Sequence, residues 1–228
     1  MLGQKQHAAE VKKVSDQEIR IQWKNLVSEN GGVLPMTLTP DVTLTNGALT
    51  FGATLANDSS LPVETIDYPY FGDLNAPGRD SSLEARILED AKSDTLVVNE
   101  VYPHFRNEKG YWGVSYPTKT LEAQQSPFCL LQGPDQGIYV GVDNAKVAYR
   151  LQYTFEQHPG VISTVTSLVP PQDEFSGFPV HLEFRLCHFV FAHPHSTTTL
   201  IPLVLSCYAG DAHNGVALYQ QRCSKLSH

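Results

Sequence analysis

Apolar and polar residues alternate along most of this chain, and alternation with a period of two indicates β-strands that bury one face. In QEIRIQWKNL, Ile19, Ile21 and Trp23 fall on one side, and the residues between them are charged or polar. Further strands are expected at 137–142, 145–155, 161–169, 179–191 and 197–208. The expected buried face of 145–155 consists of Val147, Tyr149, Leu151, Tyr153 and Phe155.

The clearest local signal is an Asn-Gly pair between two alternating runs. Apolar residues occupy every second position on both sides of Asn46-Gly47, from Val42 to Leu55, apart from the turn itself. Asn and Gly tolerate the positive φ angles of a type I′ turn, whose twist matches two antiparallel strands. The sequence therefore predicts a β-hairpin that turns at Asn46-Gly47.

Helical signals are confined to two places. SSLEARILED, residues 81–90, has Ser81 in the N-cap position and Glu84 three residues later, which is the spacing of a capping box. Near the C-terminus, Asp211 is expected to cap a second helix. Asn214-Gly215 makes a poor first turn, so the regular helix is expected to begin near Val216.

Short strands joined by turns, with few helices, are typical of an all-β fold. We therefore predict two antiparallel sheets in a sandwich or a barrel, with one or two short helices, including one at the C-terminus. The expected division of the chain is an N-terminal tail at 1–16, a β domain at 17–209 and a helical connector at 210–228.

The charge of the chain limits its partners. The formal net charge is -8, whereas nucleic acids and anionic membranes attract a basic surface. No stretch has the ~20 apolar residues of a membrane-spanning helix, so we expect neither nucleic acid nor membrane as a partner. The cysteines lack CxxC spacing and are expected to be unpaired, with a disulfide as the alternative: Cys129, Cys187, Cys207 and Cys223.

The sequence has none of the common catalytic signatures GxSxG, HExxH, P-loop or GxGxxG. In HFVFAHPHS, His188 is followed by His193 and His195, which would share one face of a strand. A metal site would need a further ligand such as His181 or Asp211, and a polar turn is the simpler interpretation. We expect no metal and no cofactor.

Glycoside cleavage would need two carboxylates that converge, about 5–10 Å apart. The sequence does not show which acidic residues come together, and most of them are expected in solvated turns. The candidates are Asp67, Asp73, Glu84, Glu100, Asp143 and Asp211.

The stretch 66–116 carries many aromatic residues among its expected loops. A sugar stacks its apolar C–H face on a ring while its hydroxyls bind polar groups, and an exposed patch around Tyr70, Phe71, Tyr111 and Trp112 would provide such a surface. The alternatives are rings that pack on another domain or in the core. The carbohydrate-binding candidates are Tyr70, Phe71, Asp73, Arg79, His104, Tyr111 and Trp112.

Three segments, in order, resemble one family. TLTNGALTFGATLANDSSLPVETIDYPYFGDL resembles the strand, turn, strand and "YP..G.L" segment of the N-terminal β-sandwich in bacterial proteins related to glycoside hydrolases. SYPTKTLEAQQSPFCLLQGPDQGIYVGVDN resembles the "YP", strand and "GLY.G..D" stretch of that sandwich, and CYAGDAHNGVALYQQ resembles its "Y.GDWH.A...Y..W" junction. The resemblance covers roughly residues 17–223.

This resemblance implies a galactose-mutarotase-like β-supersandwich, which in the family precedes a (β/α)-barrel that carries the catalytic carboxylates. Ala212 stands where the family usually has Trp, and Gln221 falls near its second Trp, so on this resemblance the chain would be a divergent member. Residues 210–228 would then connect to a barrel in cis or in trans, and a bacterial periplasmic or secreted protein is slightly favoured. The junction positions that match are Tyr208, Gly210, Asp211, His213 and Tyr219.

Three functional hypotheses result. In the first, the chain is a non-catalytic, carbohydrate-associated sandwich that packs on a barrel and shapes its sugar cleft. In the second, it is a self-contained sugar-active enzyme, similar to a mutarotase, an epimerase or a lyase, with His and carboxylate side chains on one concave sheet. In the third, it is a structural or oligomerisation domain without a ligand.

Overall fold

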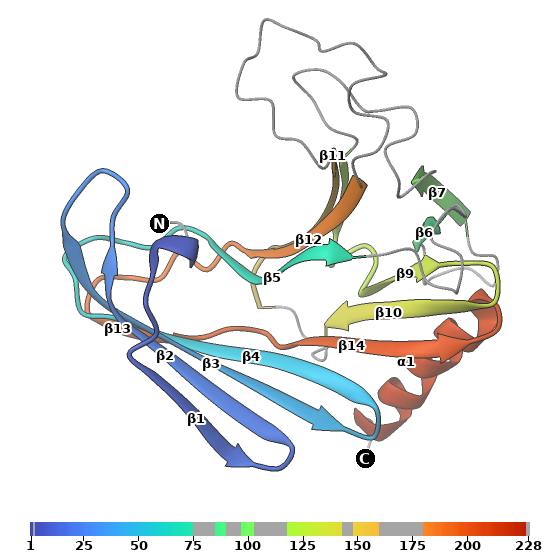
Figure 1. The fold of residues 1–228 in the computed structure, drawn as a ribbon, viewed down its shortest axis with the longest axis horizontal. Coiled ribbons are helices and arrows are strands. Elements are labelled where there is room, and N and C mark those ends of the chain that lie inside the picture. Colours follow the sequence, from blue (N-terminus) through green and yellow to red (C-terminus); the bar gives the residue numbers. More distant parts are fainter. Residues whose placement is uncertain are drawn as a thin grey trace, which may run out of the picture.

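The computed structural model describes residues 1, 3–74, 85–89, 97–102, 118–142, 148–159 and 180–226. These residues form two antiparallel sheets and one α-helix (Figure 1). A short 3-10 helix, η1 (Gly3–Lys5), precedes the first strand. The predicted antiparallel architecture of two sheets with a C-terminal helix is confirmed.

Within the described residues, the smaller sheet has four strands and the larger sheet has ten. Its order from one edge is β1 (Glu10–Ser15), β2 (Glu18–Val27), β3 (Val33–Thr45), β4 (Ala48–Asn57), β14 (Leu203–Ala209), β10 (Gln136–Val142), β9 (Phe128–Gln132), β6 (Ala85–Glu89) and β7 (Val97–Tyr102), with β13 (Ser196–Thr199) also paired to β4. The smaller sheet has four strands in the order β5 (Ile66–Leu74), β12 (Val180–His188), β11 (Leu151–Pro159) and β8 (Thr118–Glu122).

The β3–β4 hairpin forms as its sequence predicts. Asn46 has φ 52° and Gly47 has φ 75°, the positive values that a type I′ turn requires at both central positions. From this turn the pairing runs without a shift from Thr45 opposite Ala48 to Met36 opposite Asn57.

The main core lies between the two sheets. In the smaller sheet, every second side chain from Leu151 to Phe155 of β11 points into this core. Leu151, Tyr153 and Phe155 of β11 are 0% exposed, as their spacing predicts. They pack with apolar residues of β12 and with Leu203 of β14 in one cluster. Tyr149, also expected on this face, precedes the strand and packs against the same cluster; Val147 lies outside the described residues.

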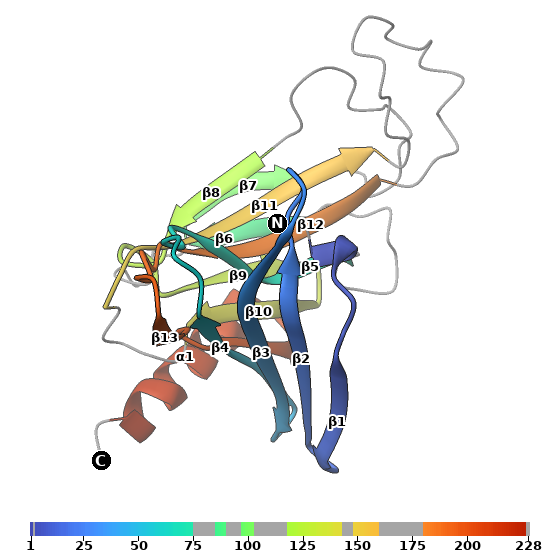
Figure 2. The same cartoon turned by 90° about the vertical axis from the view of Figure 1, so that its left-hand side faces the viewer.

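The larger sheet extends beyond the smaller one at the ends of β1–β4 nearest the β1–β2 and β3–β4 turns (Figure 2). Val42 lies opposite both Ile19 and Phe51, so the side chains of these three residues point to the same face of the sheet. This is the inner face, because Phe51 contacts Phe71 of the smaller sheet. On this part of the inner face Val11 is 65%, Ile19 48% and Leu44 47% exposed. We call it the wing face; it consists of Val11, Ile19, Ile21, Val42 and Leu44.

Three sequence expectations are corrected. Residues 85–89, expected within a helix, form β6, because pairing with β7 on one side and β9 on the other provides hydrogen bonds that a short, isolated helix would have to form alone. The expected strand 197–208 divides into β13 and β14, with Leu200–Pro202 between them. The expected tail at 1–16 contains β1, which pairs with β2. Within the described residues, no helix is long and apolar enough to cross a bilayer.

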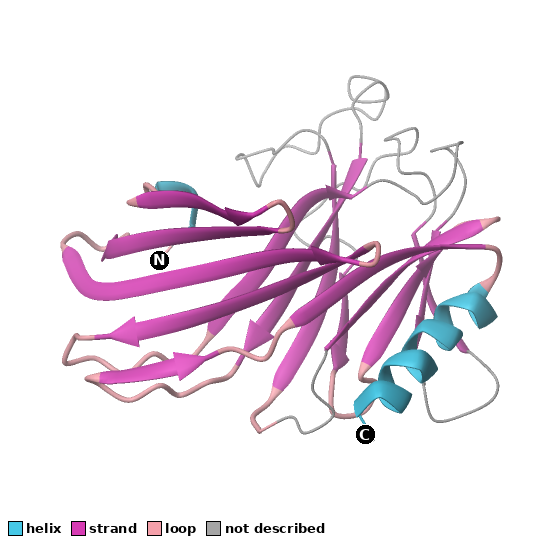
Figure 3. Cartoon of the chain, turned by 90° about the horizontal axis from the view of Figure 1, so that it is seen from below, coloured by secondary structure: helices cyan, strands magenta, loops and turns pink. Residues whose placement is uncertain are grey.

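Helix α1 (Ala212–Leu226) lies along the outer face of the larger sheet (Figure 3). Val216 and Tyr219 pack on a cluster formed by Phe128, Leu130, Tyr139 and Tyr208. The helix begins at Ala212 rather than near Val216, because Asp211 Oδ1 accepts the His213 N–H at 3.0 Å. Gly215 then fits against Leu130 and Tyr208, where a Cβ atom would lie within 2.7 and 2.8 Å of their side chains.

We predict that Gly215→Ala lowers the free energy of unfolding by about 1 kcal/mol, although alanine normally stabilises a helix. The added methyl group must displace a buried side chain, and overpacking costs about 1–3 kcal/mol against a gain of up to about 1 in helix propensity. Urea unfolding measures the change. Gln220→Ala, at an exposed position of the same helix, is the control and should not destabilise. A more stable Gly215→Ala variant would contradict the packing.

Candidate functional site

Three of the predicted carbohydrate-binding residues lie on β5, and they differ in environment. Tyr70 is 52% exposed. Phe71 instead packs on the core, with ring centroids 4.9 Å from Phe51 and 5.7 Å from Phe184, so it does not contribute to an exposed patch. The backbone of Asp73 lies in β5. The remaining candidates lie outside the described residues: Arg79, His104, Tyr111 and Trp112.

The outer face of the smaller sheet is polar around Tyr70. On β12, Glu183 and Arg185 alternate with the buried residues Leu182, Phe184 and Leu186 and therefore point away from the core. Glu156 of β11 lies directly opposite Glu183, and Tyr70 of β5 lies opposite Arg185. Paired strands thus bring one phenol, one guanidinium and two carboxylates together.

These four side chains interact with one another. The Tyr70 hydroxyl donates a hydrogen bond to Glu183, and Arg185 Nη2 lies 3.8 Å from Glu156 Oε2. Partial burial first, and then the hydrogen bond to Glu183, raise the pKa of Tyr70 above its ordinary value. The phenol therefore stays protonated and remains a donor at any physiological pH.

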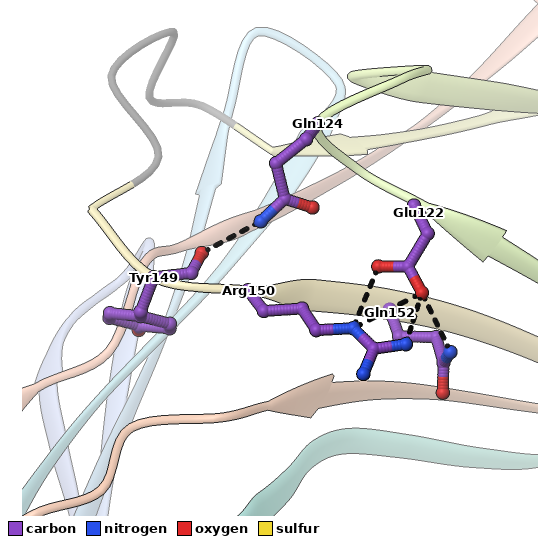
Figure 4. Close-up of polar contacts among 5 residues, drawn as sticks. All are labelled: Glu122, Gln124, Tyr149, Arg150 and Gln152. Atoms are coloured by element: carbon purple, nitrogen blue, oxygen red, sulfur yellow. Dashed lines mark hydrogen bonds and ion pairs between the residues drawn. The ribbon is translucent and has the colours of Figure 1, made fainter.

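A second polar cluster lies on the same face, at the β8 side of the sheet (Figure 4). Arg150 Nε lies 3.0 Å from Glu122 Oε2, a second guanidinium nitrogen also donates to Glu122, and Gln152 Nε2 donates to the same carboxylate at 3.0 Å. The guanidinium also lies 4.6 Å from the ring centre of Phe189. These donors, the Arg150 hydrogen bond first, lower the pKa of Glu122.

The face has the groups that bind sugar hydroxyls. Carboxylates accept from hydroxyls, guanidinium and amide groups donate to carbonyl or hydroxyl oxygens, and the Tyr70 ring offers an apolar surface. Cys187 lies on the same face, but burial first, and then its hydrogen bond to Asp67, raise the pKa of its thiol to about 12. A protonated thiol is a poor nucleophile, so Cys187 is suited to structure rather than to covalent chemistry.

Sequence reasoning missed Glu156, Glu183 and Arg185 as members of this face. The signal was present, since HLEFRLCH alternates strictly and places Glu183 and Arg185 on its polar side. What the sequence did not contain was the register that sets Glu156 opposite Glu183 and Tyr70 opposite Arg185.

His188, which is 0% exposed, has a structural role. Its Nε2 donates to the Tyr68 carbonyl at 2.7 Å, and its Nδ1 accepts from the Tyr149 hydroxyl at 3.1 Å. The same hydroxyl accepts the Ile201 N–H at 2.9 Å. Because a carbonyl only accepts, Nε2 carries a proton. Burial lowers the pKa of His188 to about 4, so the imidazole is neutral near pH 7. Residues from β5, β12 and the β13–β14 link are thereby tied together.

The matched junction positions hold α1 on the sheet. Tyr208 Oη donates to Gln132 at 2.6 Å, and Tyr219 stacks on Phe128 with centroids 4.7 Å apart. Gly210 turns the chain between β14 and α1 with φ 86°, which glycine adopts without strain. Asp211 caps the helix and lies 3.4 Å from the exposed His213. All five positions therefore have roles within this chain.

The metal alternative gains no support from the described residues, in which no three His, Cys, Asp or Glu side chains converge. His193 and His195 are exposed in the turn before β13. No disulfide joins the four cysteines, as expected: Cys129, Cys187, Cys207 and Cys223.

No protein-family model matches the sequence, and no curated protein matches it. Solved structures with a similar layout include a candidate aldose 1-epimerase from Escherichia coli K12, at 12% identity and a TM-score of 0.48, over 88% of this chain and 68% of that chain. A galactose mutarotase-like protein from Lactobacillus casei matches at 13% identity and a TM-score of 0.43, over 88% of this chain and 72% of that chain.

A GH36 alpha-galactosidase from Geobacillus stearothermophilus matches at 9% identity and a TM-score of 0.44. The match covers 86% of this chain but 24% of the galactosidase, so this chain spans about a quarter of that enzyme's length. These similarities describe the layout of strands alone.

We predict that His188 makes stability depend on pH between 6.5 and 4. Burial lowers its pKa from 6.5 to about 4, so the unfolded chain binds a proton in this range that the folded chain does not. The free energy of unfolding therefore falls as pH falls, by about 3 kcal/mol from this residue. Urea unfolding at several pH values measures it. His188→Gln should flatten the dependence, and equal slopes for the two proteins would contradict the prediction.

Proposed function

We propose that this chain is a non-catalytic, carbohydrate-associated β-sandwich domain that packs on a sugar-active catalytic domain and helps to shape its cleft. The observation that carries the proposal is the wing face, a set of exposed apolar residues on the inner face of the larger sheet, beyond the part that the smaller sheet covers. Val11, Ile19 and Leu44 are each about half exposed or more. Strand pairing sets Val11 opposite Ile21 and Ile19 opposite Val42, and Lys13, opposite Ile19, lies at the edge of this face.

An apolar sheet face is stabilised when a second layer covers it, because apolar area is then removed from water. In this chain the smaller sheet covers the inner face around Phe51, and the wing face continues the same surface beyond it. A contiguous exposed apolar patch of this kind is typical of an interaction site. A barrel domain, in cis or in trans, is the partner that the family resemblance implies.

The carbohydrate half of the proposal rests on the polar outer face of the smaller sheet. Tyr70 offers an exposed ring beside Glu183 and Arg185.

A second candidate function is a self-contained sugar-active enzyme, and one observation favours it. Glu156 and Glu183 lie directly opposite each other on neighbouring strands, where Cβ atoms are about 4.5–5.5 Å apart, so two carboxylates converge on one face. Polarimetry of fresh α-D-glucose and α-D-galactose solutions tests it. Faster mutarotation with the protein, abolished by Glu183→Gln, would favour the enzyme; no acceleration favours the non-catalytic domain.

We predict that Ile19→Lys with Leu44→Lys changes the free energy of unfolding by less than about 1 kcal/mol, because both side chains are already half in water. The same variant should bind less of a hydrophobic dye and should no longer associate with a barrel domain encoded after residue 228 or beside the gene. Dye fluorescence, urea unfolding and copurification of the coexpressed domains measure these effects.

Thr43→Lys is the matched control, since Thr43 lies on β3 between Val42 and Leu44 and points to the opposite face of the sheet. It should leave both dye binding and association unchanged. Loss of association in the control, or undiminished association in the double variant, would exclude the wing face as the docking surface. The absence of any barrel encoded with the chain would exclude the docking proposal altogether.

A further inference from the structure

An exposed aromatic residue stands in the turn between β12 and β13, far along the chain from the stretch 66–116. Phe191 is 61% exposed, more than Tyr70 at 52%. It belongs to the segment HFVFAHPHS, which also contains His193 and His195. Ala192, next to Phe191, is 4% exposed and packs on an apolar cluster with Leu55 and Met36.

The backbone of this turn is held by hydrogen bonds on several sides. The Phe191 N–H donates to the Glu64 carbonyl at 3.1 Å, and Ala192 exchanges two backbone bonds with Val63, at 2.8 and 2.9 Å. Phe191 has φ 46° and His195 has φ 54°, a conformation that non-glycine residues adopt only where their surroundings impose it. The phenyl ring therefore projects from a fixed support.

A buried asparagine joins this turn to the neighbouring loop. Asn57, 0% exposed, donates through Nδ2 to the His193 carbonyl at 3.1 Å and to the Leu61 carbonyl at 2.8 Å. Its Oδ1 accepts from the Ser59 hydroxyl at 2.7 Å. One amide thus fixes both loops side by side, and Leu61, itself 50% exposed, lies on the second loop.

We propose that the Phe191 turn is a second carbohydrate-contact site, which takes a neutral pyranose with its C–H face on the Phe191 ring. His193 and His195 follow Phe191 in the same turn, and both are exposed. A neutral imidazole has one donor and one acceptor nitrogen, which matches the hydroxyl groups around a sugar ring. An aromatic side chain has few rotatable bonds, so it loses little conformational entropy when a ligand binds. It therefore binds a sugar better than an equally apolar but more flexible side chain does.

The chemistry of the turn favours a sugar over other occupants. A metal ion would need a third ligand, and no group of three suitable side chains occurs in the described part of the chain. A stable protein interface buries about 800 Å² per partner, far more than Phe191 and Leu61 offer. A single stacked sugar ring fits one exposed aromatic side chain in a turn that also carries exposed polar side chains.

This site goes beyond the proposed function and does not depend on it. It lies where Glu64, just before β5, meets the chain after β12, whereas Tyr70 lies within β5 opposite Arg185. It also lies apart from the docking surface, since none of its residues belongs to the wing face. If docking through the wing face fails, the proposal of a sugar site at Phe191 is not contradicted.

The test is a titration of the isotopically labelled chain with methyl glycosides of D-glucose, D-galactose and D-mannose, followed by amide chemical shifts. At least one glycoside should shift amides in 190–196 and 57–64. Phe191→Ala should weaken binding by about tenfold or more, whereas Phe191→Tyr should retain it. Val14→Ala, which truncates an exposed apolar side chain on β1, is the matched control and should leave this affinity within about twofold.

Two results would overturn the proposal. One is no shift in these segments with any of the glycosides. The other is binding that survives Phe191→Ala unchanged. If Tyr70→Ala abolishes binding while Phe191→Ala does not, the Phe191 site is excluded and the sugar half of the proposed function is supported instead. Thermal unfolding of each variant verifies that the fold is retained.

Discussion

The apolar layer between the two sheets is the constraint on which the rest of the structure depends. Tyr153 and Phe155 of β11 and Phe184 of β12 are at most 1% exposed, and each fully buried side chain of this kind contributes about 1.5–3 kcal/mol. Because alternate residues of a strand point to opposite faces, burying these rings also fixes which residues face outward. The position of Glu156, Glu183 and Arg185 on one polar surface is therefore a consequence of the core.

Two further sets of contacts hold the sandwich together, and both involve residues from motifs that were candidates for a functional role in the sequence. His188, with both ring nitrogens bonded, ties the smaller sheet to the β13–β14 link of the larger one. Tyr208 and Tyr219 hold α1 on the outer face of the larger sheet. Hydrogen bonding and packing thus account for these histidine and tyrosine residues without any catalytic role. The proposals for function rest instead on surfaces that the fold leaves uncovered.

Three uncovered surfaces carry the proposals, and each has its own proposed role. The wing face is apolar and broad, which suits a covering domain. The outer face of the smaller sheet carries paired charges around an exposed tyrosine, which suits hydroxyl-rich ligands. The Phe191 turn presents one ring on a braced backbone, which suits a single sugar ring. Each surface has a different chemistry, so substitutions at one leave the others intact and the three roles separate experimentally.

The sequence by itself determined the features that depend on neighbouring residues: the Asn46-Gly47 hairpin, the buried faces of β11 and β12, and the helix cap at Asp211. Periodicity and turn chemistry act over a few residues, so they can be recognised without the rest of the chain. Only the tertiary structure decided that 85–89 forms a strand, that Phe71 packs inward while Tyr70 stays exposed, and that Gly215 allows α1 to approach the sheet. The same holds for the meeting of Glu156 with Glu183 and for the exposure of Phe191, because strand register and long-range packing arise between segments that are distant in the chain.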